Sequence, residues 1–365
     1  MAGSTPPRRV LLLTSSPLEG SEGADKQLAA MLASTILDTE FTWFTRWPAR
    51  GRTPRLAGGH PVPIASRDGM PHAGERLQVT VAGALLARQT DLVHAILTVG
   101  TGFPLLSRLW PALFPYRRVI HTVPGVMDSR LLGRARPLGV TVAYSQVTAQ
   151  ALRDAGFGDV RVIPPAVSPA QWPRRPRPTG LPTVLFAGHH DPGGGATEAI
   201  AAAAAARRTG ARFRLVLAMR LRPGQRRRAL AAGLAGLAHR EGLGDITVRA
   251  HVADMPGLLA ATDVLLFIPR TLSGKADIPL IVLEALATGR PVIISDLPQV
   301  AGLGDAVLRV PAGDIQRAGL LLAGLLAEPR RWQAMAERGN AMVRAQFGPQ
   351  RCAAGYQRLY TELLG

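Results

Sequence analysis

One acidic residue stands alone in the most apolar stretch of the sequence. Residues 278–287 (IPLIVLEALA) predict a helix of Leu, Ile, Val and Ala that carries a single carboxylate, Glu284. Burying a carboxylate on such a face is costly unless hydrogen-bond donors reach it. Gly289 then stops the helix, and an Arg-Pro pair leads into a buried strand at 292–295, a pattern typical of an α/β unit. Glu284 is therefore the first candidate for a binding residue.

A glycine-containing loop follows the first apolar strand. Residues 15–23 contain Gly20 and Gly23 and lie between a strand at 9–14 and a helix at 24–33. Strand, glycine loop and helix form the arrangement that points backbone N–H groups at an anion. The loop lacks the Gly-Lys-Ser/Thr ending of a Walker motif. It is therefore either an anion-binding loop or a plain strand-to-helix turn.

A second such loop opens the other half of the chain. It begins at Gly188 and ends in three consecutive glycines, residues 193–195, so that Gly194 and Gly195 directly precede a helix. Backbone amides in such a run can wrap a phosphate as a nest. His189 either donates a hydrogen bond to the same anion or caps the loop.

Short apolar strands alternate with helices along both halves of the sequence. Strands are predicted at 9–14, 41–45, 92–96, 118–122, 140–144, 160–164, 183–186, 213–218, 246–250, 263–268 and 292–295. Further helices are predicted at 197–208, 254–261, 329–347 and 350–364, and a basic helix is predicted to end at about residue 241. This alternation predicts two doubly wound α/β domains with mainly parallel sheets, whose ligands bind at the carboxyl ends of the strands.

The segment around Glu284 resembles the C-terminal domain of retaining glycosyltransferases of family 4. In that family an acid, seven residues and a Glu precede Ala, a small residue, Gly, a basic residue, Pro and an apolar strand. Glu284 matches the second acid, which in the family binds the ribose hydroxyls of a nucleotide-sugar. Asp-Leu-Val-His-Ala at 91–95 and Val-Ile-Pro at 162–164 resemble strand ends of the family's first domain. The resemblance implies the α/β GT-B fold, with two Rossmann-like doubly wound domains that face a central cleft.

The same resemblance sets the expected domain boundaries. An N-terminal acceptor-side domain is expected at 1–170 and a nucleotide-sugar-binding domain at 183–348. Proline and arginine crowd residues 171–182, which predicts a linker. The last helix, 349–365, is expected to pack back toward the N-domain, as in the family.

The sequence departs from the family at the groups that bind the donor diphosphate. In the loop that begins here at Gly188, the family has an Arg after the first glycine and a Lys about five residues later. This chain has His189 and Gly194 at those positions. Cations or backbone N–H groups are needed to stabilise the negative charge that develops on the departing phosphate. Lys275, one of only two lysines in the chain, is the best candidate for a displaced cation. Leu280 and the glycines at 188, 194 and 195 complete the implied donor contacts, with Gly20 and Gly23 from the first domain.

The two predicted catalytic residues also depart from the family. Its first acid should fall at Ala276, whereas the acid here is Asp277, which either faces the donor sugar or caps the following helix. Pro124 stands where the family often has His, and His121 lies three residues earlier, as a catalytic residue or a half-buried strand histidine. In retaining transfer the departing phosphate can take the acceptor's proton, so no strong external base is required.

Composition narrows the classes of partner. The chain has 365 residues, 47% of them hydrophobic, and a net charge of +18. Its arginines are scattered and no aromatic residues interleave with them, which argues against nucleic acid. The basic charge is either a solvated face or a patch for peripheral contact with an anionic membrane. The single Cys352 suits a reducing compartment, and neither a signal peptide nor a membrane-spanning stretch is expected.

We therefore predict a retaining, metal-independent hexosyltransferase that moves a sugar from a UDP- or GDP-linked donor to a hydroxyl acceptor. The acceptor is a small molecule, a lipid or a glycan, the nucleotide-sugar is a co-substrate, and no cofactor is expected. The predicted location is cytoplasmic, with the inner membrane face as an option. Two other classes remain: a non-catalytic glycosyltransferase-like binding protein, motivated by the missing groups at positions 189, 194 and 276, and a distant third, a basic nucleic-acid-binding protein.

Overall fold

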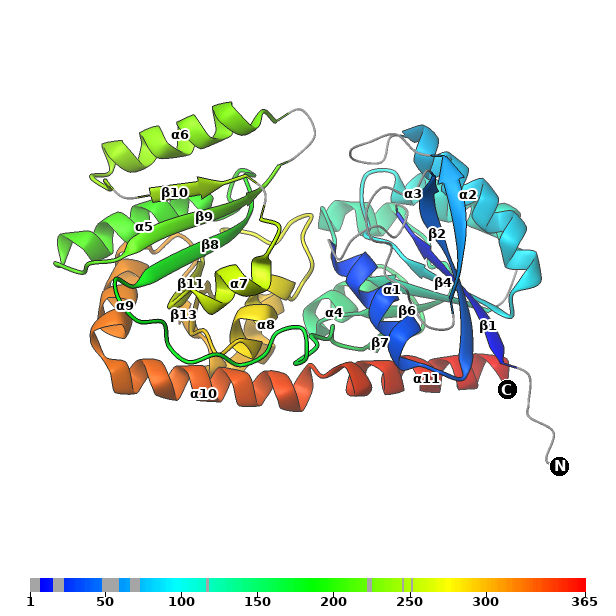
Figure 1. Cartoon of the computed structure of the whole chain (residues 1–365). Helices are drawn as coiled ribbons and strands as arrows, with labels where there is room; N and C mark the ends of the chain where they lie inside the picture. Colours follow the sequence, from blue (N-terminus) through cyan, green and yellow to red (C-terminus); the bar gives the residue numbers. More distant parts are fainter. Residues whose placement is uncertain are drawn as a thin grey trace. The chain divides into compact units, whose positions relative to one another are not determined.

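The chain folds into two compact units (Figure 1). The structure is a computed structural model that describes residues 7–15, 23–47, 59–65, 73–115, 118–221, 225–244, 246–250 and 252–365. The first unit comprises Met1–Ala166, Ser273–Asp277 and Pro349–Gly365, and the second comprises Val167–Leu272 and Ile278–Gly348. The segment 171–182 thus lies in the second unit, whereas the last helix lies in the first.

A parallel seven-stranded sheet forms the centre of the first unit, with the order β3-β2-β1-β4-β5-β6-β7. Its strands are β1 (Arg8–Thr14), β2 (Thr39–Trp47), β3 (Gly59–Ala65), β4 (Leu92–Ile96), β5 (Val119–Val123), β6 (Val140–Ala143) and β7 (Val160–Val162). Every residue of β4 and β5 is buried, as expected for central parallel strands covered on both faces. The predicted strands of this half are confirmed to within two residues, and β3 is additional.

Helices cover both faces of this sheet. On one face, α1 (Ala24–Thr35) and α11 (Pro349–Leu364) share an apolar core with β1 and β2. On the other face lie α2 (Ala73–Leu86), α3 (Phe103–Leu113) and α4 (Gln146–Asp154). Short 3-10 turns occupy η1 (Ala87–Gln89) and η2 (Ser129–Arg134).

A buried polar chain ties α11 to the sheet of the first unit. The Nδ1 of His94 lies 2.8 Å from the hydroxyl of Tyr360, and its Nε2 lies 2.8 Å from the hydroxyl of Thr122. Thr122 in turn lies 3.0 Å from the hydroxyl of Tyr356. Burial lowers the pKa of His94 to about 3, so the ring is neutral. A neutral imidazole has one donor and one acceptor, which matches one hydroxyl at each nitrogen.

The second unit contains a parallel six-stranded sheet with the order β10-β9-β8-β11-β12-β13. Its strands are β8 (Thr183–His189), β9 (Arg214–Arg220), β10 (Ile246–Arg249), β11 (Val264–Phe267), β12 (Val292–Ser295) and β13 (Leu308–Val310). Its helices are α5 (Ala196–Arg208), α6 (Arg227–Arg240), α7 (Met255–Ala260), α8 (Leu280–Ala287), α9 (Ile315–Ala327) and α10 (Pro329–Gln346), with a 3-10 segment η3 (Pro298–Ala306). Both units are therefore doubly wound and parallel, as the alternation of elements predicts.

Small residues allow the helices of the second unit to pack closely. A Cβ placed at Gly319 on α9 would lie 2.6 Å from the Cβ of Ala205 on α5. A Cβ at Gly339 on α10 would lie 2.6 Å from a methyl of Leu286 on α8.

Within the described ranges, no helix combines the length and the apolarity needed to cross a membrane.

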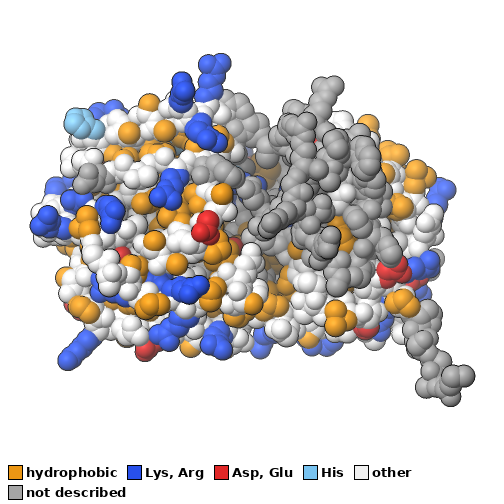
Figure 2. Space-filling model, viewed as in Figure 1, with side chains coloured by type: hydrophobic (Ala, Val, Ile, Leu, Met, Phe, Trp, Pro, Cys, Tyr) orange, Lys and Arg blue, Asp and Glu red, His pale blue; other side chains and the backbone are white. Residues whose placement is uncertain are grey.

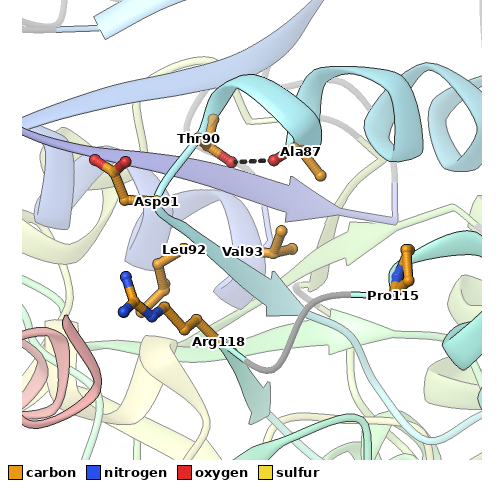
Figure 3. A pocket seen from close by; sticks show the side chains of 7 residues that line it. All are labelled: Ala87, Thr90, Asp91, Leu92, Val93, Pro115 and Arg118. Carbon is orange, nitrogen blue, oxygen red and sulfur yellow. Dashed lines mark hydrogen bonds between the residues drawn. The ribbon is translucent and has the colours of Figure 1, made fainter.

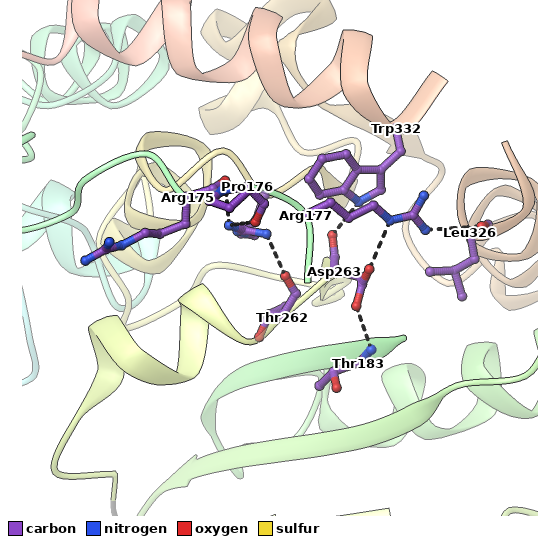
Figure 4. A network of polar contacts seen from close by, with 9 residues as sticks. Arg175, Pro176, Arg177, Thr183, Thr262, Asp263, Leu326 and Trp332 are labelled. Atoms are coloured by element: carbon purple, nitrogen blue, oxygen red, sulfur yellow. Dashed lines mark hydrogen bonds and ion pairs between the residues drawn. The ribbon is translucent and has the colours of Figure 1, made fainter. Parts of the chain in front are cut away.

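The segment predicted as a linker is fastened to the second unit at its arginines. Arg177 pairs with Asp263 at 3.1 Å, and its guanidinium lies 5.1 Å from the ring centre of Trp332 (Figure 4). The other carboxylate oxygen of Asp263 accepts the backbone N–H of Thr183 at 2.9 Å, at the first residue of β8. The segment is thus part of the packed unit.

Arg290, the basic residue after the helix-stopping Gly289, is fully buried beneath the same segment. Its guanidinium donates to the carbonyls of Arg175 and Pro176 at 2.8 Å each and to that of Thr262 at 3.2 Å. Burial lowers the pKa of Arg290 to about 10, against the attraction of Asp263, so it stays charged at neutral pH. The Gly-Arg-Pro sequence therefore has a structural role here.

Replacing Arg290 tests this role. Arg290→Lys keeps the charge but loses the planar fork that reaches carbonyls of two segments. We expect the free energy of unfolding to fall by about 2–4 kcal/mol, measured by urea denaturation, because buried acceptors lose their donors. The matched control is Arg309→Lys in the exposed pair with Asp296, which should cost less than about 1 kcal/mol. Equal losses in both variants would contradict the assignment.

Candidate functional site

The second glycine loop joins β8 to α5 in the second unit, at the carboxyl end of β8. Gly193 and Gly195 adopt positive φ angles of 66° and 102°, which favour glycine. A Cβ at Gly195 would lie 3.0 Å from the backbone nitrogen of Pro269, and one at Gly194 would lie 2.8 Å from the carbonyl of Asp191. Gly195 is also the N-cap of α5, and no side chain caps that helix. The loop therefore presents backbone at the N-terminus of a helix, where an anion is favoured.

His189 is the last residue of β8 and is half-buried at the start of this loop. Its Nδ1 donates to the backbone carbonyl of Arg220 at the end of β9, at 3.1 Å. This bond assigns the Nδ1 proton and orients the ring. Gly188 beside it is packed over Phe186, whose ring lies 3.2 Å from the place of a Cβ.

Glu284 lies in the middle of α8 and is only 5% exposed. The helix runs from Leu280, which is half-buried, to Ala287. The hydroxyl and the N–H of the C-cap residue, Thr288, both donate to the backbone carbonyl of Glu284. Gly289 follows with a φ of 78°, as expected of a residue that stops a helix. The helix and its end are as predicted, and the ribose-binding role of Glu284 stays a prediction.

Lys275 and Asp277 lie in the first unit, although they belong to the second half of the sequence. The N–H of Asp277 donates to the carbonyl of Pro124 at 2.9 Å, just after β5. The carbonyl of Lys275 packs on Gly125 so closely that a Cβ there would lie 1.9 Å from it. Gly125 is therefore the residue that allows this segment to lie on the end of β5.

The carboxylate of Asp277 is buried at the start of α4. It accepts from the hydroxyl of Ser145, the N-cap of that helix, at 2.9 Å. Burial raises the pKa of Asp277 to about 6, while hydrogen bonds from Thr148 and Ser145 act in the opposite direction. The prediction that Asp277 caps the following helix is wrong, because the N-cap of α8 is Pro279. Its role toward the donor sugar stays a prediction.

His121 is enclosed in the core of the first unit, with no exposed surface. Its Nε2 donates to the carbonyl of Leu97 at 3.0 Å, and its ring stacks on Phe103 with 5.0 Å between centres. Burial lowers the pKa of His121 to about 4, so the ring is neutral. This environment favours the alternative of a strand histidine over that of a catalytic residue.

The first glycine loop is described only at its end. Gly20 lies outside the described residues, whereas Gly23 is the N-cap of α1 with a φ of 105°. A Cβ at Gly23 would lie 2.7 Å from one carboxylate oxygen of Asp25. The other carboxylate oxygen of Asp25 accepts a hydrogen bond from the hydroxyl of Ser15 at 3.3 Å. Burial raises the pKa of Asp25, although Lys26 lowers it.

A hollow of about 360 Å³ lies elsewhere in the first unit (Figure 3). Its lining residues are Ala87, Thr90, Asp91, Leu92, Val93, Pro115 and Arg118. These residues lie where β4 and β5 begin, whereas ligands of doubly wound sheets bind where strands end. The hollow is therefore distinct from the predicted site.

Two charged residues that the sequence analysis does not single out lie at the second glycine loop. The N–H of Arg270 donates to the carbonyl of Gly193 at 2.8 Å, and its Nε donates to Glu198 on α5 at 2.8 Å. Arg270 follows β11, the neighbour of β8 in the sheet. Its position three residues after a buried strand is a sequence signal that could have found it.

Comparison with known proteins places this architecture in a class. The chain superposes along its length on sucrose-phosphate synthase from Thermosynechococcus elongatus, with a TM-score of 0.76, 19% identity and 98% and 99% of the two chains covered. It superposes on Anabaena HepE in complex with UDP and glucose with a TM-score of 0.73 at 15% identity, covering 97% of this chain and 100% of that one. A trehalose 6-phosphate synthase from Burkholderia multivorans gives 0.74 at 15% identity, with 98% and 99% covered. The fold is thus GT-B, as predicted.

The sequence comparison defines the second unit more closely. Residues 181–341 match the family model described as Glycosyl transferases group 1. No curated protein matches the chain by sequence. The chain therefore carries a glycosyl transferases group 1 domain, and this finding confirms the predicted glycosyltransferase class. The domain contains the second glycine loop, Arg270 and Glu284.

The neutral state of His121 makes a testable pH dependence. Its pKa is 6.5 in the unfolded chain and about 4 in the folded one, so between these values the unfolded state binds one more proton. Stability from this group is complete above pH 6.5 and is lost as the pH falls toward 4, by up to about 1.4 kcal/mol per pH unit.

We expect His121→Phe to reduce the slope of unfolding free energy against pH in this window by about that amount. Urea denaturation at each pH measures the slope. An unchanged slope in His121→Phe would mean that the folded protein protonates this ring freely.

Proposed function

We propose that the chain is a retaining, metal-independent glycosyltransferase that moves a sugar from a UDP- or GDP-linked donor to a hydroxyl acceptor. The observation that carries the proposal is Glu284, a buried carboxylate on an otherwise apolar helix inside the glycosyl transferases group 1 domain. A carboxylate has two acceptor oxygens, and the vicinal hydroxyls of a ribose can donate to them. The HepE structure with UDP and glucose supports a uridine nucleotide as the first donor to test.

The proposed donor contacts lie at the carboxyl end of the second sheet. Glu284 binds the ribose, Leu280 lies one turn before it, and the loop of Gly188, His189, Gly194 and Gly195 receives the diphosphate. Amides at a helix N-terminus stabilise the charge that develops on a departing phosphate. That phosphate can take the proton of the acceptor hydroxyl, so the proposal does not require His121.

The first unit is proposed to serve the acceptor. Asp277 is retained as a group for the donor sugar, with Lys275 as a cation of the same segment and with Gly20 and Gly23 as backbone contacts. The alternative function is a non-catalytic binding protein, which is favoured by the absence of the family's Arg, Lys and first acid at positions 189, 194 and 276. Nucleotide binding separates the two.

Glu284→Gln is the decisive variant. It keeps the shape of the side chain but removes the charge that accepts two hydroxyls, so we expect nucleotide affinity to fall by about 10- to 100-fold. The measurement is the shift in melting temperature with UDP, GDP, TDP, ADP or CMP, with magnesium or with EDTA. Ligand at about 100 times its Kd stabilises the folded state by about 2.7 kcal/mol.

The matched control is Glu337→Gln, at an exposed position on α10 that should bind nucleotide like the wild type. A shift that is equally large in Glu284→Gln would remove the ribose from Glu284. No shift with any nucleotide in the wild type would favour the non-catalytic alternative. A shift that requires magnesium would overturn metal independence.

We also propose that the first unit contacts an anionic membrane from the cytoplasmic side, where a lipid acceptor would be presented. Leu77, Val81 and Leu85 form an exposed stripe along α2, at intervals of four residues. Leu105 and Leu109 are exposed on α3 of the same sheet face. On the face drawn in Figure 2, hydrophobic side chains gather where Figure 1 places α2.

The charges on these two helices suit anionic lipid. Arg76 and Arg88 on or directly after α2 and Arg108 on α3 are exposed, whereas the acid of α2, Glu75, is buried. An apolar stripe flanked by arginines is typical of a helix that lies in the membrane interface. The occupant we propose is therefore a bilayer of anionic lipid.

Vesicle sedimentation tests this contact. The protein should sediment with phosphatidylglycerol vesicles and less with phosphatidylcholine, and Leu77→Gln combined with Leu85→Gln should weaken binding about tenfold or more. Leu320→Gln on α9, at an equally exposed leucine of the second unit, is the control. Equal binding by the double variant and the control would exclude this face.

A further inference from the structure

Arg270 is fixed to the glycine loop by its backbone. It follows β11, and its N–H donates to the carbonyl of Gly193 at 2.8 Å. The place of a Cβ on Gly193 lies 3.4 Å from the Cβ of Arg270, so glycine brings the two backbones together. The side chain of Arg270 therefore starts at the carboxyl end of the sheet, beside the loop that ends at the N-terminus of α5.

Glu198 holds one edge of that guanidinium. It lies in the first turn of α5, is 7% exposed, and accepts the Nε–H of Arg270 at 2.8 Å and the hydroxyl of Thr197 at 2.8 Å. Burial raises the pKa of Glu198, but its own backbone N–H, Thr197 and Arg270 outweigh burial and lower it. Glu198 is thus ionised at neutral pH and anchors Arg270 through a single nitrogen.

The rest of the guanidinium faces solvent. The side chain of Arg270 is 63% exposed, although its anchoring carboxylate is almost completely buried. Gly313, in the loop after β13, lies beside the guanidinium, because a Cβ there would be 3.9 Å from the guanidinium carbon. The exposed part of the guanidinium is therefore open to a ligand.

The chemistry of that ligand follows from the surroundings. A guanidinium held through Nε presents its two terminal nitrogens as a planar fork, which matches two oxygens of one phosphate. The nearby N-terminus of α5 also favours an anion. Positions 189 and 194, where a cation is expected from the resemblance, hold His and Gly.

We propose that Arg270 is the cation that binds the diphosphate of the donor, and that Glu198 is the positioning residue that aims it. The inference rests on the proposed function, because it requires a nucleoside diphosphate at this site. It assigns the missing positive charge to the loop after β11, 75 or more residues from the glycine loop in sequence but next to it in the sheet.

Calorimetric titration with a nucleoside diphosphate and with the matching nucleoside tests the assignment. The probes are UDP and uridine, and GDP and guanosine. Arg270→Gln should bind the diphosphate about 10- to 100-fold more weakly and the nucleoside as the wild type does, because only the phosphate contact is lost. Arg309→Gln, in an exposed ion pair of the same unit, is the control and should bind both normally.

Two variants of Glu198 isolate its positioning role. Glu198→Gln and Glu198→Ala remove the same negative charge, but only Gln keeps an oxygen that accepts from Arg270. We expect Glu198→Gln to bind the diphosphate several-fold more tightly than Glu198→Ala, with equal affinity for the nucleoside. Equal diphosphate affinities in these two variants would show that Glu198 does not aim Arg270.

The outcomes separate this inference from the proposed function. A wild type that binds UDP or GDP while Arg270→Gln binds it equally well overturns the role of Arg270 and leaves the proposed function standing. A wild type that binds neither diphosphate overturns both. Thermal denaturation of each variant in the absence of ligand confirms that it is folded.

Discussion

The parallel pairing of β8 with β11 is the constraint on which the second unit depends. Val184 pairs with Val264 and Leu185 with Leu265, although about 80 residues separate the two strands. At the amino end, the Asp263 carboxylate accepts the N–H of Thr183, and the backbone N–H of Asp263 donates to Thr183 in return. Parallel strands run in the same direction, so the glycine loop after β8 and the residues after β11 lie at the same edge of the sheet.

This pairing explains why residues with no local relationship form one site. Gly195 is required to be glycine because Pro269 passes within 3.0 Å of where its Cβ would lie, and the next residue, Arg270, bonds to Gly193. The buried Arg290 fastens the entry segment at the opposite edge, where β11 and β12 begin. At the carboxyl edge, the bond from Arg270 to Gly193 fixes the two loops to each other, and groups fixed in this way can stabilise charge by preorganisation.

The sequence predicts what depends on local pattern. Central strands such as β4, β5 and β12 are short and mostly apolar, and α8 with its glycine stop is readable because its residues are adjacent. Strand β3 is missed because Pro61 and Pro63 interrupt its pattern, and prolines are confined to edge strands such as this one. The predicted capping role of Asp277 fails for a local reason. Pro279 disfavours helix at Ile278, so α8 begins too late for Asp277 to cap it.

Long-range partners are what the sequence does not predict. Asp277 meets Ser145 across 132 positions, and Arg270 meets Glu198 across 72. Each pair forms only after the order of the strands is set, and strand order leaves no trace in local periodicity. That Arg270 can compensate for the missing cations at positions 189 and 194 therefore has to be inferred from the structure.

That compensation bears on whether the missing groups of the donor site matter. Glu198 and Glu284 are buried carboxylates, and a fold that needed only stability would lose little or gain if apolar residues replaced them. Glu198 binds and orients Arg270, and on the proposed function Glu284 binds the hydroxyls of the donor ribose. On this assignment the site keeps the charge that a departing diphosphate requires and obtains it from a different strand. The guanidinium also differs in kind from a lysine on the glycine loop, because a fork fixed through Nε constrains the direction of the phosphate whereas an ammonium constrains only its distance. The departures from the family pattern then describe a change in how the phosphate is oriented rather than the loss of a site.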